Sequence, residues 1–196
     1  MTAEEEQALI RRAQAGDTAA FGELVRQQQT AVFNTAYRLL GTRRDAEDAT
    51  QEAFLRAYRA LARFDPERPF APWIKTIVTN LCYNQLARKQ EQLTRPIADL
   101  RGQDDSLSLD DWQSHTPQPE QLLAQSEREA RTRAAILALP PHYRAVIELR
   151  HFQGLDYQAI AQVMNRSVAN VKSDLFRARK KLAEMLKEDI DKPSSE

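Results

Sequence analysis

Apolar side chains recur at every third or fourth position along most of the chain, which is the period of an amphipathic α-helix. No stretch alternates convincingly with a period of two, and the 196 residues include only five glycines. We therefore expect an all-α protein with two small helical domains, at residues 1–90 and 120–187, each able to bury a core. A flexible acidic linker at residues 91–119 and a frayed tail at residues 188–196 complete the predicted organisation.

Four helices are predicted in the first domain from their apolar periodicity and from the residues at their ends. A glycine follows each of the first two helices, and residues that can cap a helix N-terminus precede the second and the third. The Pro-rich segment Phe64–Phe70 predicts a loop before the fourth helix, because each proline restricts the residue before it. The predicted helices cover residues 4–15, 18–40, 43–62 and 72–89.

The helical period fails from Glu91 to Pro119, and residues 91–130 carry nine acidic side chains against three basic ones. Such a composition is typical of a linker that is extended or disordered. The second domain is expected to begin near Glu120 with a helix to residue 138. Pro140 and Pro141 then end this helix, and a further helix is expected at residues 142–152.

The segment Gly154–Leu182 has the pattern of a helix-turn-helix. The small side chain of Ala161 lies where two helices must cross closely. Asn165 occupies the sharp turn, because asparagine tolerates the left-handed backbone that glycine usually supplies. Ser167 can then cap the second helix by accepting a backbone N–H.

The second helix of this motif is rich in cations, with six basic residues and one acidic residue between Arg166 and Leu182. Small and amide side chains can reach base edges, whereas Lys and Arg neutralise phosphates. The alternative is an ordinary amphipathic helix with a solvated basic face, but the turn, cap and preceding helix favour DNA binding. The predicted DNA-facing residues are Ala169, Asn170, Lys172, Ser173, Phe176, Arg177 and Lys180.

The composition excludes several other functions. Cys82 is the single cysteine, so no intramolecular disulfide forms, and the three histidines have no metal-ligand spacing. No Gly-rich phosphate loop and no G-x-S-x-G motif occurs, so we expect neither an enzyme nor a bound cofactor or metal. The acidic N-terminus and the lack of an apolar run of membrane-spanning length predict a soluble, cytoplasmic protein without membrane insertion.

The residues described so far resemble a bacterial RNA polymerase sigma factor of the extracytoplasmic-function (ECF) group. Leu139–Ala161 and Val168–Leu182 are similar to sigma region 4. The motif D-A-E-D-A-T-Q-E-A-F at Asp45–Phe54 resembles region 2.2, and the run Phe70–Leu81 resembles regions 2.3 and 2.4. The chain departs from the family pattern at Asn84, often Asp, at Arg166 and Ser167, often an apolar residue and Pro, and at Asp174, commonly Arg.

The resemblance implies a factor that binds core RNA polymerase and directs promoter-specific initiation, in an extracytoplasmic or stress response. Region 2 is expected to dock on the clamp helices of polymerase through Asp48, Gln51 and Glu52. Region 2 also reads the −10 element of promoter DNA, and region 4 reads the −35 element. The −10 candidates are Lys75, Thr76, Thr79, Asn80, Tyr83 and Asn84.

Several alternatives remain open at this point. Phe64, Phe70 and Trp73 could stack on unpaired bases. Phe70 and Trp73 fall on one helical face with Ile74, Ile77 and Leu81, however, and this favours core packing. The linker is either a plain spacer or an acidic segment in the polymerase channel. The resemblance also implies control by an anti-sigma factor, often membrane-tethered, against control by synthesis alone. The rival function is a conventional helix-turn-helix regulator, which leaves the first domain unexplained.

Overall fold

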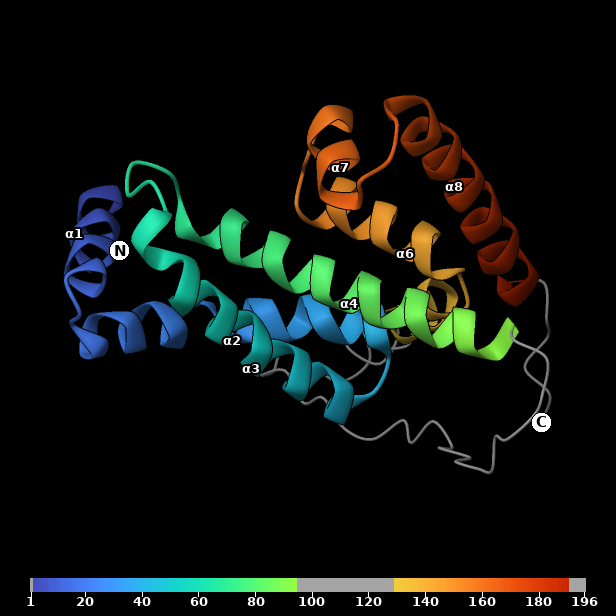
Figure 1. Ribbon diagram of the computed structural model, residues 1–196. Coiled ribbons are helices and arrows are strands. Elements are labelled where there is room, and N and C mark those ends of the chain that lie inside the picture. Colours follow the sequence, from blue (N-terminus) through green and yellow to red (C-terminus); the bar gives the residue numbers. More distant parts are fainter. Residues whose placement is uncertain (1, 95–128, 191–196) are drawn as a thin grey trace.

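The computed structural model of the chain describes residues 2–94 and 129–190, and every regular element in these ranges is helical (Figure 1). The predicted all-α fold is confirmed. In the first domain the elements are α1 (Ala3–Gln14), α2 (Thr18–Leu40), α3 (Arg43–Ala60), the 3₁₀ turn η1 (Leu61–Arg63) and α4 (Phe70–Thr94). In the second domain they are a helical segment at 129–137, α6 (Pro141–Ile147), the π-helical segment η2 (Glu148–Phe152), α7 (Tyr157–Met164) and α8 (Val168–Ile190).

The helix ends of the first domain follow from the residues expected to form them. The Asp17 carboxylate accepts hydrogen bonds from two first-turn amides of α2, and Gly41 ends that helix with a left-handed φ of 85°. Thr42 Oγ1 accepts from the backbone N–H of Asp45 at the start of α3, at 3.2 Å. These caps satisfy amides that a helix leaves unpaired at its N-terminus.

The third helix is two residues shorter than predicted, because the chain tightens into η1 after Ala60. The Gln14 side-chain amide donates to the carbonyl oxygens of Leu61 and Phe64, at 2.9 and 2.7 Å. The side chain of Gln14 therefore supplies hydrogen-bond donors to two backbone carbonyl groups that follow the end of α3. This contact between distant segments is absent from any local sequence pattern.

The core of the first domain lies between α2, α3 and α4, with α1 packed across one end (Figure 1). Along α4, Phe70, Ile74, Val78 and Cys82 form a fully buried stripe at a spacing of four residues. The rings of Phe64 and Trp73 stack with centroids 4.3 Å apart over this end of the core. The expected core packing of Phe70 and Trp73 is confirmed, and Cys82 is buried on the same stripe.

The second domain packs α6, η2 and α7 around the apolar side of α8. The helix predicted at residues 142–152 is present, but it widens into a π-helix at Glu148, where the N–H of Gln153 donates to the carbonyl oxygen of Glu148 at 3.1 Å. Segments of this kind often occur at functional sites. Here it carries Glu148 and Leu149 into buried positions.

The two domains are in contact. The helices α6 and η2 lie against α2, and α6 and α7 lie against α4 (Figure 1). Most of the predicted linker, and residues 191–196 of the predicted tail, lie outside the described residues. Residues 91–94 continue α4, and residues 188–190 continue α8.

Candidate nucleic-acid interface

The helix-turn-helix has the local geometry that its sequence predicts. Asp156 caps α7 by accepting from the N–H of Ala159 at 2.7 Å. Asn165 adopts φ 51° and ψ 51°, the single positive φ of a non-glycine residue in the described part of the chain. Ser167 Oγ accepts from the N–H of Asn170 at 3.2 Å and so caps α8. The turn therefore fixes where the second helix of the motif begins.

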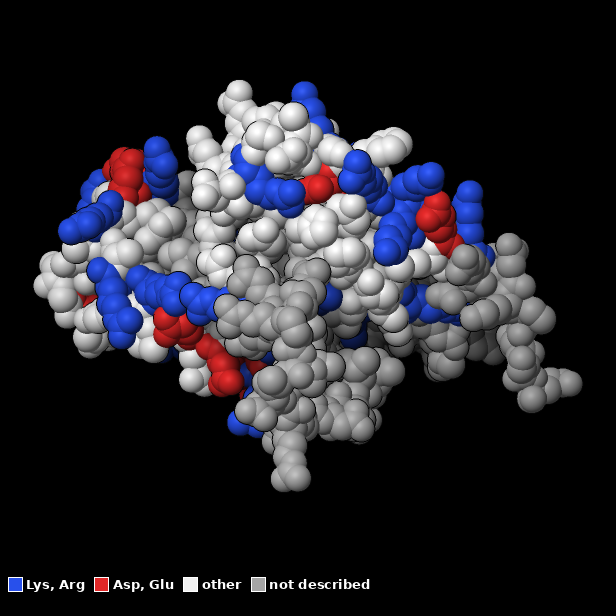
Figure 2. Space-filling view, turned by 45° about the vertical axis from the view of Figure 1, so that its right-hand side comes forward, with Lys and Arg blue, Asp and Glu red and all other residues white. Residues whose placement is uncertain are grey.

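The two faces of α8 have different surroundings. Val171, Leu175 and Ala178 form an apolar stripe that is buried in the domain core. Every predicted DNA-facing residue of this helix is exposed: Ala169, Asn170, Lys172, Ser173, Phe176, Arg177 and Lys180. Figure 2 shows Lys and Arg side chains gathered over α8. The ring of Phe176 is 71% exposed among these cations.

Tyr157, at the start of α7, was not among the predicted residues, yet it holds two cations. Lys172 Nζ lies 5.6 Å and the Arg150 guanidinium 5.2 Å from the centroid of its ring. Arg150 also donates to the carbonyl oxygen of Leu155 at 2.8 Å. Cation–π contacts of this kind orient the charged groups beside α8. An aromatic residue at the first position of α7 is the only signal that the sequence offers for this role.

Two departures from the family pattern, Arg166 and Asp174, face each other in the structure. Asp174 is only 7% exposed, and its Oδ2 lies 2.7 Å from Arg166 Nη1. The two atoms form a close ion pair without the alignment of a hydrogen bond. Asp174 therefore lies away from the exposed face of α8. The ion pair thus connects the segment between α7 and α8, which contains Arg166, with the second helical turn of α8, which contains Asp174.

A second contact joins η2 to α8. Arg179 Nε donates to His151 Nε2 at 3.2 Å, which requires a neutral imidazole that carries its proton on Nδ1. Burial, and then the cations of Arg179 and Arg150, lower the pKa of His151 below its ordinary value. Burial also lowers the pKa of His142, an effect that Asp174 partly opposes. Both histidines therefore favour the neutral form in the folded domain.

The predicted polymerase-docking residues lie on α3, opposite its buried stripe of alanines. Asp48 and Gln51 are exposed, whereas Glu52 is half-buried and accepts a hydrogen bond from Arg56 Nε at 2.7 Å. Leu55 is 51% exposed on the same helix. Tyr58 is 45% exposed, and its ring lies edge-on to that of Phe21. The α3 surface thus combines apolar and polar side chains, as protein interfaces do.

The −10 candidates on α4 are divided by the second domain. Lys75, Thr76 and Asn80 are partly exposed, and Asn84 is exposed. Thr79 is buried and Tyr83 packs against the core of the second domain. The surface expected from the sequence is therefore only partly accessible in this arrangement.

Within residues 2–94 and 129–190, no helix is long and apolar enough to cross a membrane. The same residues contain no group of three or more His, Cys, Asp or Glu side chains that could hold a metal ion.

Comparisons with known proteins match both domains. Residues 24–92 match the family Sigma-70 region 2, and residues 129–182 match Sigma-70, region 4. The RNA polymerase sigma-H factor of Pseudomonas aeruginosa is 34% identical over 191 residues, which cover 95% of this chain and 96% of that protein. The ECF RNA polymerase sigma-E factor of Escherichia coli is 33% identical over 179 residues, which cover 89% of this chain and 90% of that protein.

The fold also resembles a solved structure of CnrH in complex with the cytosolic domain of CnrY. The TM-score is 0.60 at 26% identity, and the match covers 96% of this chain and 99% of that one. Both sigma regions occur in order, and the identity to sigma factors extends over nearly the whole chain. The chain belongs to the ECF group of RNA polymerase sigma factors, and it directs transcription initiation.

Proposed function

We propose that this sigma factor docks on core RNA polymerase through α3, reads the −10 promoter element with α4 and reads the −35 element with α8. The observation that carries the proposal is the fully exposed, cation-rich face of α8 on one domain, together with the exposed face of α3 on the other. Two separate surfaces on two domains suit a protein that must bind polymerase and DNA together. A conventional helix-turn-helix regulator has no use for the surface of α3.

On α3, Asp48 and Gln51 provide polar groups beside the exposed side chain of Leu55. An apolar contact ringed by polar groups is the usual composition of a protein interface. Glu52 already pairs with Arg56 on its own helix, so we assign it a smaller part in docking. We place the whole function in the cytoplasm, where RNA polymerase works on chromosomal DNA.

On α8, Arg177 and Lys180 neutralise phosphates, whereas Ala169, Asn170 and Ser173 lie near base edges. The exposed ring of Phe176 can contact the methyl group of a thymine, an apolar feature of the major groove. The cation–π contact with Tyr157 orients Lys172 toward the backbone of the same site.

On α4, Lys75 provides charge, and Thr76, Asn80 and Asn84 provide hydrogen-bonding groups for the opened −10 strand. The Thr76 hydroxyl donates to the carbonyl oxygen of Pro72 at 2.9 Å, so its oxygen can still accept a bond from a base.

We further propose that a separate anti-sigma protein restrains this factor. The support is the fold shared with CnrH, which was solved with the cytosolic domain of CnrY. Such a partner would cover the α3 surface and the basic face of α8 together. Affinity purification of the tagged chain from unstressed cells should recover a stoichiometric small partner. Recovery with polymerase alone, in every growth condition, would contradict this part of the proposal.

The docking proposal is tested with the Asp48→Ala/Gln51→Ala double variant. Gel filtration with core polymerase should show co-elution of the wild-type chain and weaker binding of the variant, with unchanged thermal unfolding. The matched control is Glu23→Ala/Gln27→Ala, which removes an acid and an amide from α2 and should bind normally. If the Asp48→Ala/Gln51→Ala variant co-elutes with polymerase as fully as the wild-type chain, docking through this face of α3 is contradicted.

A further inference from the structure

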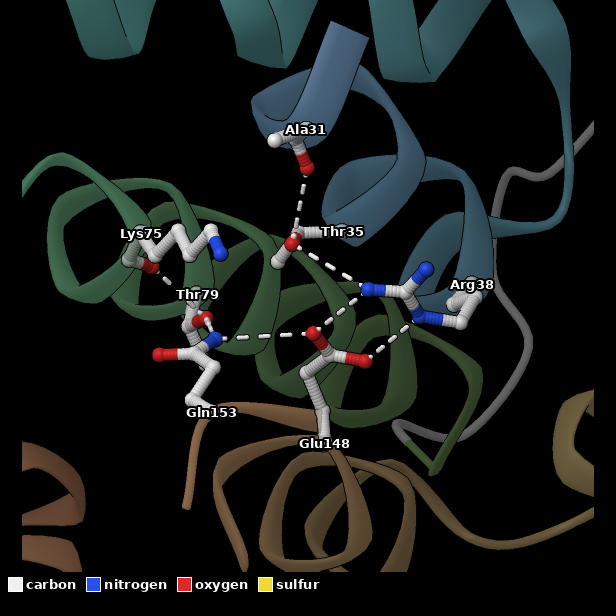
Figure 3. A network of polar contacts seen from close by, with 7 residues as sticks. All are labelled: Ala31, Thr35, Arg38, Lys75, Thr79, Glu148 and Gln153. Atoms are coloured by element: carbon white, nitrogen blue, oxygen red, sulfur yellow. Dashed lines mark hydrogen bonds and ion pairs between the residues drawn. The ribbon is translucent and has the colours of Figure 1, made fainter. Parts of the chain in front are cut away.

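Five side chains from both domains form one polar contact, which we name the interdomain latch: Thr35, Arg38, Thr79, Glu148 and Gln153 (Figure 3). Its centre is a two-pronged ion pair. Arg38 Nε lies 2.7 Å from Glu148 Oε2, and Arg38 Nη2 lies 2.9 Å from Glu148 Oε1. Paired hydrogen bonds between a guanidinium and a carboxylate are strong and directional. The two residues come from α2 and η2, 110 positions apart in the sequence.

Glu148 depends on the other domain for its counter-charge. It is only 2% exposed, and its ion-pair partner is Arg38. A buried carboxylate is stable only when a cation and hydrogen bonds compensate it. Arg38 is itself fixed in place, because its Nη2 lies 3.3 Å from Thr35 Oγ1 and its guanidinium lies 4.3 Å from the centroid of the Phe152 ring. If the domains separate, Glu148 becomes solvated and this ion pair is lost.

The same contact covers part of the −10 surface. Gln153 Nε2 donates to Thr79 Oγ1 at 2.8 Å, and Thr79 is only 1% exposed (Figure 3). Tyr83, four residues further along α4, packs against the core of the second domain. Both residues belong to the α4 face assigned to the opened strand. DNA and the second domain therefore compete for one surface.

A second polar contact joins the two domains. The Arg144 guanidinium donates to the carbonyl oxygen of Leu39 on α2. Two buried atoms at this interface, Arg144 Nε and Gln153 Oε1, have no hydrogen-bond partner among the described residues. Polar interfaces between domains resemble transient protein contacts and permit relative motion. The polar contacts between the domains suit an interface that opens during function.

We propose that the second domain docks on the first as a closed, autoinhibited state, held by the Arg38–Glu148 pair, in which Thr79 and Tyr83 are masked from promoter DNA. The inference rests on the proposed −10 function of α4. A latch that keeps about nine-tenths of the molecules closed weakens the apparent affinity about tenfold, because only the open fraction binds.

The variant Arg38→Ala in the full chain distinguishes the proposed closed state from a direct electrostatic effect of Arg38 on DNA binding. Removal of a cation ordinarily lowers affinity for DNA. The latch predicts the opposite, a gain of about tenfold, because Glu148 loses its partner and the closed state is destabilised. The probe is fluorescein-labelled single-stranded DNA of random sequence, and small-angle X-ray scattering should show a larger radius of gyration.

The matched control is Arg26→Ala on the same helix, because Arg26 pairs with Glu23 of its own helix and lies outside the interface. Arg26→Ala should leave the radius of gyration unchanged and should not raise the affinity for the DNA probe. The charge swap Arg38→Glu/Glu148→Arg rebuilds the pair in reverse and should return the chain toward the closed dimensions. Circular dichroism must show that each variant keeps its helices.

The outcomes separate the two claims. A radius of gyration that Arg38→Ala leaves unchanged overturns the latch. An expanded chain whose affinity does not rise overturns the masking of α4. If neither the wild-type chain nor any variant binds the probe, the −10 function of α4 fails, and the masking fails with it. Equal binding by the compact wild type and the expanded variant overturns the masking alone.

Discussion

Helices α8 and α4 both carry predicted DNA-binding residues, but they expose them differently. On α8 all the predicted residues are accessible, whereas on α4 the second domain covers Thr79 and Tyr83. The reason lies in how many partners each helix has. The apolar stripe of α8 packs within its own domain and leaves the opposite face to solvent, but α4 is packed on two sides. Amphipathic periodicity predicts which face of a helix packs in the core of its own domain. It does not predict that another domain covers a second face.

A substitution in the buried apolar stripe of α8 should cost the second domain more stability than any other change considered for this helix. Leu175 is buried in the core, and the adjacent Phe176 is exposed. Leu175→Ala should lower the free energy of unfolding by about 2–5 kcal/mol, because it removes buried methyl groups and leaves a cavity. Phe176→Ala should change stability by about 0.5 kcal/mol or less while weakening −35 binding. Urea unfolding measures the stability of both variants, and duplex-binding titrations measure their affinity for the −35 element. Equal losses of stability would show that α8 does not bury Leu175 and expose Phe176 as described.

A smaller effect is expected at the ion pair that sets the start of α8. Asp174→Ala leaves Arg166 without its partner, and because Arg166 is still partly solvated we expect a loss of about 1–2 kcal/mol. The control is Glu184→Ala, whose weak pair with Lys180 is exposed and should contribute less than about 0.5 kcal/mol. Thermal unfolding compares them. A harmless Asp174→Ala would show that the pair does not brace the turn.

The sequence predicts the helix-turn-helix almost residue by residue, because its determinants are local. The left-handed Asn165 and the Ser167 cap act within a few positions of their place in the chain. The interdomain contact is not predictable in this way. Glu148 falls within a predicted amphipathic helix, and nothing in the sequence pairs it with Arg38, 110 residues earlier. The widening of η2, which helps to bury Glu148, is likewise invisible to helical periodicity.

Lys180 lies on the exposed face of α8 that is proposed to bind DNA. Because this lysine is exposed and contacts phosphates in the proposal, Lys180→Ala should weaken binding about equally on matched and mismatched −35 sequences. The slope of log affinity against log salt should fall in magnitude by about one unit. Binding titrations over a salt series provide the measurement. A loss confined to the matched sequence would place Lys180 at a base edge.

The smallest expected effect is a difference in acid sensitivity between the domains. The pKa values of His142 and His151 are lowered from 6.5 in the folded second domain, so below that pH the unfolded state binds more protons and stability falls. The described part of the first domain contains no histidine. The pKa values of Asp17 and Glu23 are lowered from 3.8 and 4.5, so these carboxylates reduce the stability of the first domain only at more acidic pH. Between about pH 6.5 and 5 only the second domain should therefore lose stability. Thermal unfolding over this range checks the difference, and His151→Asn should reduce it.

The chemical accessibility of α4 in the full chain shows directly whether the second domain covers this helix. Thr79→Cys and Asn84→Cys place thiols on the covered and the exposed part of one helix, and the native Cys82 is buried as an internal reference. We predict that a thiol reagent modifies residue 84 rapidly and residue 79 at least about tenfold more slowly, and that Arg38→Ala brings the two rates together. If residue 79 reacts as fast as residue 84 in the chain with Arg38 intact, the second domain does not cover the −10 surface.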